Sequence, residues 1–303
     1  MKKRKAIALM ITLFFVMLIS IAVGYGLKIT NKAKISSQKE KFLIQTNIIV
    51  DDVLMLFNNS RDISEIAQDG SGLTLNMFLS SSSFIPLKSA GYDVIIKIKS
   101  ARDRFNINNL KDNNGNIKTE KFKRFKNFLI SREIQDVLGY MILDSISKNK
   151  KDLQYVTDIF YQNPNLYRKY IASRQHFDKI LRYYATSYND NVFSKLNFDK
   201  LLIFKKTDTR IDLNYANETV WELLLGCTKE RAVELASMGG SYQSLKDLNL
   251  SEDEKKNLEK FNTSFFEPIL AVSLEISKDS FKAKIEFEYD LKTKRATNFV
   301  YKI

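Results

Sequence analysis

An uncharged, apolar stretch from Ala6 to Leu27 follows four consecutive cations at positions 2–5. At a helical rise of about 1.5 Å per residue it spans roughly 33 Å, the thickness of a bilayer core. No Pro or Gly interrupts the chain from Lys28 to Asn58, and apolar side chains recur there on one helical face, at Phe42, Ile49, Val53 and Leu56. The sequence therefore predicts one long helix over residues 7–59, which crosses a membrane at 7–27 and contacts a folded head beyond it.

This N-terminus has two other interpretations. A secretory signal could be cut after Ala22-Val23-Gly24, although the apolar stretch exceeds the usual core of about 7–15 residues. A plain membrane anchor is the second alternative. The cations at positions 2–5 favour a cytoplasmic N-terminus, which would place the rest of the chain on the opposite side of the membrane.

The composition excludes several kinds of site. Cys227 is the only cysteine, so no intramolecular disulfide can form, and the single histidine, His176, excludes the usual His-rich metal centres. The sequence contains no phosphate-binding loop, nucleophile elbow, zinc-protease motif or dinucleotide fingerprint. We therefore predict no catalytic residues and no enzymatic activity.

Hydrophobic periodicity divides the rest of the chain. Alternation predicts strands at 92–100 and 104–110, after a polar, Ser-rich segment. Helical spacing, as at Phe122, Phe125 and Leu129, recurs across residues 117–205. Three further strands are predicted at the end of the chain, at 269–277, 281–291 and 296–303. This order indicates an α+β fold with an antiparallel sheet interrupted by an all-helical insertion.

Residues 214–248 resemble a helix-hairpin-helix (SAM-like) module, with a turn at Gly226 and a second helix from Thr228 to Met238. Asn214 or Asn217 is expected to cap the first helix. Residues 111–206 carry a net charge of +9, but residues 210–262 carry −3, and binding to phosphates depends on Lys and Arg. We therefore predict a structural role, and we expect the reversal of Lys229 and Arg231 to Glu to leave secretion and partner binding intact.

Other polar segments have simple interpretations. The "DNNGN" segment (112–116) is predicted to be a turn, because Lys123 occupies the place of the Glu that would close a calcium loop. The basic, Tyr-rich run 165–184 could bind single-stranded nucleic acid, but it is more typical of a solvated amphipathic helix with its rings turned inward. His176 is expected to have a surface or capping role.

The N-terminus, "KRKAIALMITLFFVMLI", resembles a prepilin-type signal, with a short basic leader before a retained hydrophobic helix. Two later segments, "RFNINNL" (104–110) and "RIDLNYANETVWELL" (210–224), resemble paired stretches of the K-type minor pseudopilin of type II secretion. The family motif corresponds here to Asn106, Asn108, Asp212 and Asn214. Together these segments extend the resemblance over nearly the whole chain.

The resemblance implies a type IV pilin-like fold, a cut between Ala6 and Ile7, and a tip position in the fibre. Ile11 stands where ordinary pilins carry a Glu that neutralises the N-terminus of the subunit above, and a tip subunit has no subunit above it. The expected organisation is a leader (1–6), a long helix (7–59), the first part of the head (60–110), a helical insertion (111–262) and C-terminal strands (263–303).

The resemblance also implies partners and a location. The partners are I- and J-type minor pseudopilins, the major pseudopilin, a prepilin peptidase and the inner-membrane assembly platform. The protein would be a single-pass protein of the bacterial inner membrane with its head in the periplasm. No cofactor is predicted; the family implies calcium in the helical domain, but residues 143–153 offer only Asp144 and Asp152, among three Lys. The alternative is a competence pseudopilin or a membrane-tethered DNA receptor.

Overall fold

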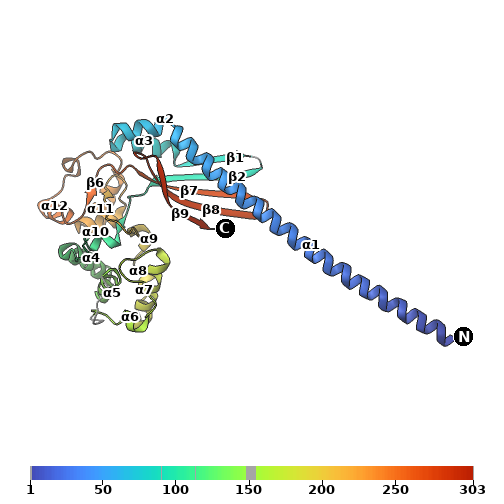
Figure 1. The fold of residues 1–303 in the computed structure, drawn as a ribbon. Coiled ribbons are helices and arrows are strands. Elements are labelled where there is room, and N and C mark those ends of the chain that lie inside the picture. Colours follow the sequence, from blue (N-terminus) through green and yellow to red (C-terminus); the bar gives the residue numbers. More distant parts are fainter. Residues whose placement is uncertain (1, 90, 113, 148–154, 303) are drawn as a thin grey trace.

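The computed structural model describes residues 2–89, 91–112, 114–147 and 155–302, and it leaves the side chains of residues 2–16 and 89 outside its description. A very long helix leads from the N-terminus to a head made of a five-stranded sheet and a group of helices (Figure 1). The predicted α+β architecture, with a long N-terminal helix, an antiparallel sheet and a helical insertion, is confirmed.

The long helix, α1 (Lys2–Asn59), is continuous over 58 residues. Its C-terminal part lies on the sheet, and the residues that it buries there recur at helical spacing: Phe42, Thr46, Ile49, Val50, Val53 and Phe57. The prediction for Leu56 is wrong, because Phe57, four residues after Val53, takes the inward position while Leu56 is 61% exposed. A head fragment beginning at residue 60 would therefore lose part of its own core.

Among the helices of the described residues, none combines the length and apolarity that a membrane crossing requires. The first part of the predicted span, residues 7–16, lies outside the side chains that the structure describes.

Two short helices occupy the segment that the sequence suggested only as polar and Ser-rich. Helix α2 (Arg61–Asp69) begins where the Ser60 side chain accepts a hydrogen bond from the Ile63 N–H, and it ends at Gly70, whose φ of 65° suits glycine. Helix α3 (Gly72–Ser82) follows and contacts the sheet. Both bury a few apolar side chains against the core below α1: Ile63, Ile66, Leu75 and Leu79.

The main sheet is antiparallel throughout, in the order β1-β2-β7-β8-β9. Its strands are β1 (Phe84–Ser89), β2 (Tyr92–Ser100), β7 (Ile269–Lys278), β8 (Phe281–Asp290) and β9 (Arg295–Lys302). The predicted strand at 92–100 and the three C-terminal strands are thus confirmed. Alternate side chains, such as Ile96 and its partner Leu274, face α1 and form one hydrophobic core.

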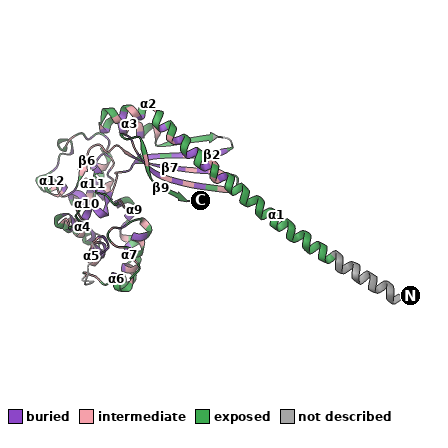
Figure 2. Ribbon diagram, in the orientation of Figure 1, coloured by how far each residue is buried: buried purple, intermediate pink, exposed green. Residues whose placement is uncertain are grey.

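The insertion leaves the sheet after β2 and returns at β7. Its elements in chain order are β3 (Phe105–Asn106), η1 (Ile107–Leu110), α4 (Thr119–Ser131), α5 (Val137–Ile146), α6 (Ile159–Gln162), α7 (Arg174–Tyr188), α8 (Val192–Lys195), α9 (Phe198–Leu201), β4 (Leu202–Ile203), β5 (Ile211–Asp212), α10 (Glu218–Leu225), α11 (Lys229–Ser237), η2 (Leu245–Leu248), α12 (Glu252–Leu258) and β6 (Thr263–Ser264). A second core, which includes Phe125 and Trp221, fills it. Figure 2 shows this buried interior, distinct from the one under α1.

The predicted strand at 104–110 is wrong except at residues 105–106. Only Phe105 and Asn106 pair with a strand, and they pair in parallel with β4. The chain then turns into η1 because the Asn106 side chain accepts the Asn108 N–H and redirects the backbone.

Candidate functional site

The predicted cleavage and tip residues lie outside the described side chains. Ala6, Ile7 and Ile11 belong to the first residues of α1, for which the structure gives the helix but no side-chain surroundings. Their roles therefore remain predictions. The remaining site residues all lie in the head.

The first half of the predicted motif forms a buried amide cluster. Asn106 Nδ2 donates to the carbonyls of Lys205 (3.1 Å) and Thr207 (3.0 Å), and its Oδ1 accepts from the Lys205 N–H (3.1 Å). Asn108 exchanges hydrogen bonds with the backbone of Ile171, at 2.9 and 2.8 Å. These side chains satisfy backbone groups on loops that are distant in sequence, as buried polar groups must be satisfied. The cluster therefore holds the start of the insertion against its middle.

The second half of the motif holds the other end of the insertion. Asn214 Nδ2 donates to the carbonyls of Tyr242 (2.9 Å) and Phe265 (2.7 Å), while its Oδ1 accepts from the N–H groups of Gly240 (3.0 Å) and Tyr242 (2.9 Å). Asp212 accepts from the N–H groups of Asn214 (3.1 Å) and Glu267 (2.9 Å). The two halves of the motif lie in separate networks, one at the exit from the sheet and one at the return to it.

Asp212 is fully buried, and this burial raises its pKa to about 7, although the N–H groups of Glu267 and Asn214 act in the opposite direction. The Glu267 carboxylate raises the pKa further. A carboxyl whose pKa is higher in the folded state than the 3.8 of a free group stabilises the fold most at low pH, and this contribution is lost as the pH rises through about 7.

We expect the free energy of unfolding of a His176→Gln variant to fall by about 2 kcal/mol between about pH 5 and about pH 8, as Asp212 ionises. His176 is replaced because burial, and then Lys179, lower its pKa. Its own contribution to the free energy of unfolding would therefore rise with pH and mask the effect of Asp212. Urea unfolding in detergent across this range measures the slope. A flat or rising profile would contradict the effect assigned to Asp212.

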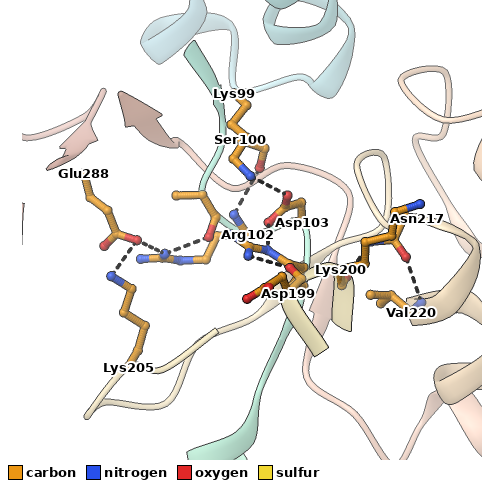
Figure 3. Close-up of polar contacts among 12 residues, drawn as sticks. Lys99, Ser100, Arg102, Asp103, Asp199, Lys200, Lys205, Asn217, Val220 and Glu288 are labelled. Atoms are coloured by element: carbon orange, nitrogen blue, oxygen red, sulfur yellow. Dashed lines mark hydrogen bonds and ion pairs between the residues drawn. The ribbon is translucent and has the colours of Figure 1, made fainter. Parts of the chain in front are cut away.

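A buried ion cluster connects the sheet to the insertion, and sequence reasoning missed it. Glu288 of β8 lies 2.8 Å from Arg102, just beyond β2, and 2.9 Å from Lys205 in the insertion (Figure 3). Asn298 of β9 donates to its other oxygen at 2.8 Å. Burial favours the neutral acid, but Arg102 and then Lys205 hold the pKa of Glu288 below its ordinary value. In sequence, Glu288 is only one polar position of an alternating strand, so no signal distinguished it from the exposed Glu286.

Arg124 of α4 lies against the hairpin between α10 and α11. Gly226, at φ 73°, faces Arg124 of α4, whose guanidinium donates to the Glu222 carbonyl at 2.6 Å. A Cβ at Gly226 would lie 2.8 Å from Arg124 Nη2. The predicted helix boundaries at Thr228 and Met238 are confirmed, and so is the cap at Asn217, which accepts from the N–H groups of Thr219 and Val220.

Arg231 of α11 holds the loop after η2. Its guanidinium donates to the carbonyls of Leu248 (2.9 Å) and Asn249 (3.1 Å) and pairs with Glu234 (2.8 Å). Reversal to Glu would break these contacts and place a carboxylate beside two carbonyls. The expectation that secretion and partner binding survive this reversal stays a prediction, and the fold would lose these contacts of Arg231.

The candidate calcium ligands are occupied by backbone groups. Asp112 accepts from the Asn116 N–H at 2.8 Å and closes a turn, as predicted. Asp144 is buried and accepts from the N–H groups of Val156 (3.1 Å) and Thr157 (2.8 Å). Asp152 lies outside the described residues. Over the part of the chain that the structure describes, no three His, Cys, Asp or Glu side chains gather as they would around a metal ion.

The basic run 165–184 is helical only from Arg174, where α7 begins. Phe177 and Tyr184 point inward as expected, but Tyr167 precedes the helix and is 50% exposed. His176 is buried rather than on the surface, and its Nδ1 accepts from the Ala172 N–H at 3.2 Å.

Burial raises the pKa of the Cys227 thiol to about 11, which keeps it protonated and unreactive.

Comparison with known proteins finds similarity among solved structures alone. No protein-family model matches the sequence, and no curated protein matches it. Among solved structures, a chain of the GspK-GspI-GspJ complex from the type 2 secretion system of enterotoxigenic Escherichia coli is similar to this one. The two chains are 9% identical with a TM-score of 0.48, and the match covers 86% of this chain and 99% of the other.

Proposed function

We propose that this chain is a minor pseudopilin of the K type, which starts and caps the pseudopilus of a type II secretion system. The observation that supports this most is α1. One part of it is bound to the sheet, and the rest continues well beyond the head as an isolated helix (Figure 1). An isolated helix of this length gains little stability by itself, so it needs lipid or other helices as partners.

The part of α1 that lies on the head also has exposed apolar side chains on its outward face, which a partner could cover. Ile44, Ile48 and Met55 are 44–62% exposed, on the side opposite the buried Phe42 and Val53. At about 100° per residue these three side chains form one outward apolar stripe. Along residues 42–57, α1 therefore has apolar side chains on both faces. One face contacts the sheet, and the other would contact a second helix.

The insertion supports a position at the tip of the fibre. It has its own buried core and lies at the end of the sheet away from the free part of α1 (Figure 1). Such bulk at the head end would obstruct a further subunit there. Ile11 agrees with this position, because a tip subunit meets no N-terminal amine and an unpaired carboxylate in the membrane would cost a few kcal/mol.

The remaining parts of the proposal follow from the resemblance in sequence. A prepilin peptidase would cut between Ala6 and Ile7, and the chain would stay in the inner membrane with its head in the periplasm. I- and J-type pseudopilins, the major pseudopilin and the assembly platform are its proposed partners. The ligands described above offer no calcium site, so none is proposed.

The DNA-uptake alternative gains no support from the head. A DNA-binding hairpin presents its backbone N–H groups to a phosphate, whereas the Gly226 N–H here donates to the Glu222 carbonyl at 3.0 Å. Arg231, one of the cations of α11, is used by the fold itself.

A pair of substitutions on α1 tests the proposal. Ile48→Asp places a charge in the outward stripe, and we expect it to weaken co-purification with I- and J-type pseudopilins by at least about tenfold, because the carboxylate would be buried without a partner. Its melting temperature should not change, since Ile48 is exposed in the isolated chain. The measurement is pull-down from detergent alongside a thermal scan.

Asn47→Asp is the matched control, because it adds the same carboxylate one residue away at an exposed polar position. It should bind its partners normally. Normal assembly of Ile48→Asp, or equal loss in both variants, would show that the stripe is not a helix-binding surface.

A further inference from the structure

The last strand of the sheet has a free edge. Among the strands of the described residues, β9 pairs only with β8, and every residue from Arg295 to Lys302 is exposed except Ala296, which is half-buried. Figure 2 shows it as an exposed arrow at the margin of the sheet. A strand in this position presents unpaired N–H and C=O groups, so it can accept a further strand.

Exposed rings lie along this edge. Phe299 stacks on the buried Phe287 of β8, with ring centroids 5.1 Å apart, and Tyr301 lies 6.3 Å beyond Phe299. Phe299 is 38% exposed, Val300 47% and Tyr301 46%. Phe299 and Tyr301 therefore extend the apolar α1-facing side of the sheet past the strip that α1 covers.

The two edges of the sheet differ. On the opposite edge, β1 contains Pro86, which lacks an N–H and so weakens that strand as a template. β9 contains no proline. A bulge at Asn298, with φ 59°, divides β9 and leaves Phe299–Lys302 as a regular stretch.

The positive charge near β9 favours an acidic partner strand at this edge. Residues 292–302 contain Lys292, Lys294, Arg295 and Lys302 and no carboxylate, and of these Lys302 pairs with Glu286 of β8 at 3.0 Å. Within the described chain, neither Lys292 nor Arg295 belongs to an ion pair at 4.0 Å or less. Like charges oppose the pairing of this edge with the same edge of a second copy, and they attract an acidic strand.

We propose that β9 is a docking edge for an extended, acidic segment of a partner protein, which adds to the sheet as a further strand. Its backbone pairs with Phe299–Lys302, its alternate apolar side chains cover Phe299 and Tyr301, and its carboxylates lie near Arg295. Backbone hydrogen bonds supply affinity in this mode, while alternate side chains supply specificity. This site is separate from the outward stripe of α1.

A fluorescent peptide in which glutamate alternates with valine and phenylalanine probes the edge. We expect it to bind the full chain in detergent, as followed by anisotropy, and to bind more tightly than the same peptide with lysine in place of glutamate. Methylation of its backbone nitrogens should abolish binding, because strand pairing needs these donors. No binding, or binding that survives methylation, would overturn the proposal.

Matched variants locate the peptide. Tyr301→Thr should weaken binding about tenfold, as the loss of an aromatic contact at an interface commonly does, whereas Phe84→Thr on the opposite edge should have no effect. Arg295→Glu should weaken binding about threefold, whereas Lys282→Glu, an exposed change on β8, should not. Equal effects within either pair would place the peptide elsewhere.

The alternative partner for the free edge of β9 is a second copy of this chain. Sedimentation of the wild type and of Tyr301→Thr distinguishes it. A dimer that Tyr301→Thr dissociates would show that β9 pairs with itself, and this would overturn the assignment to an acidic partner. A monomer that binds the peptide supports it. Neither result depends on filament formation, so the proposed function stands or falls separately.

Discussion

Replacing Asn214 by Ala is expected to lower the free energy of unfolding by about 3–5 kcal/mol, since each buried group left unpaired costs about 1–3 kcal/mol. The Asn214 amide serves two N–H groups and two carbonyls, at 2.7–3.0 Å, and they belong to Gly240, Tyr242 and Phe265. It is buried, with 4% of its surface exposed. Urea unfolding in detergent, followed by the fluorescence of Trp221, measures the change.

Asn217→Ala is the matched control, because it removes an amide of the same kind three residues later. Asn217 caps α10 from a partly exposed position, and the loss of such a cap costs about 1 kcal/mol. Equal losses in the two variants would mean that Asn214 acts as an ordinary cap and does not connect segments.

The long helix and the long strands were the most predictable parts of the fold, because their periodic patterns extend over many residues. α1 was evident because an apolar stretch and an amphipathic stretch meet without a helix breaker, and β7 and β8 were evident because apolar and polar residues alternate along them. The error at Leu56 is instructive. Inward positions recur at three or four residues, and only the fold decides between Leu56 and Phe57.

Short elements were less predictable, because their cause is local hydrogen bonding or tertiary contact. α2 and α3 are short and bury only a few apolar residues each, so a periodic pattern has little length in which to appear, and Ser60 and Gly70 carry most of the boundary signal for α2. The segment 104–110 alternates like a strand, yet its Asn side chains bind loops about 60 to 100 residues away. No local pattern contains that information.

The candidate site was predictable only in part, for the same reason. The motif residues Asn106, Asn108, Asp212 and Asn214 were identified through resemblance, and all four prove to be buried. Their partners were not predictable, because most of these partners are backbone N–H and C=O groups, which are the same in nearly every residue type and leave no pattern in the sequence. Glu288 and Lys205 were missed because a buried charged pair and an exposed one look alike in sequence.

Glu288→Gln is the second large effect, expected to lower the free energy of unfolding by about 3 kcal/mol, because removal of one partner from a buried ion cluster leaves the others uncompensated. Arg102 and Lys205 would keep their charges beside a neutral amide, with side chains only 11% and 24% exposed. The loss should also loosen the insertion relative to the sheet, since Lys205 belongs to the insertion while Arg102 follows β2. Hydrogen exchange across residues 99–106 and 202–206 would report this loosening directly.

Glu286→Gln provides the control, because Glu286 lies on the same strand and also contacts two lysines, Lys284 at 2.7 Å and Lys302 at 3.0 Å. Its side chain is 37% exposed, so water compensates the lost pairs and the expected change is below about 1 kcal/mol. The contrast isolates burial as the cause, since charge, strand and number of cationic partners are the same. If both variants lose the same stability, or if exchange at the junction is unchanged in Glu288→Gln, the cluster does not hold the insertion to the sheet, and the amide networks around Asn106 and Asn214 must do so alone.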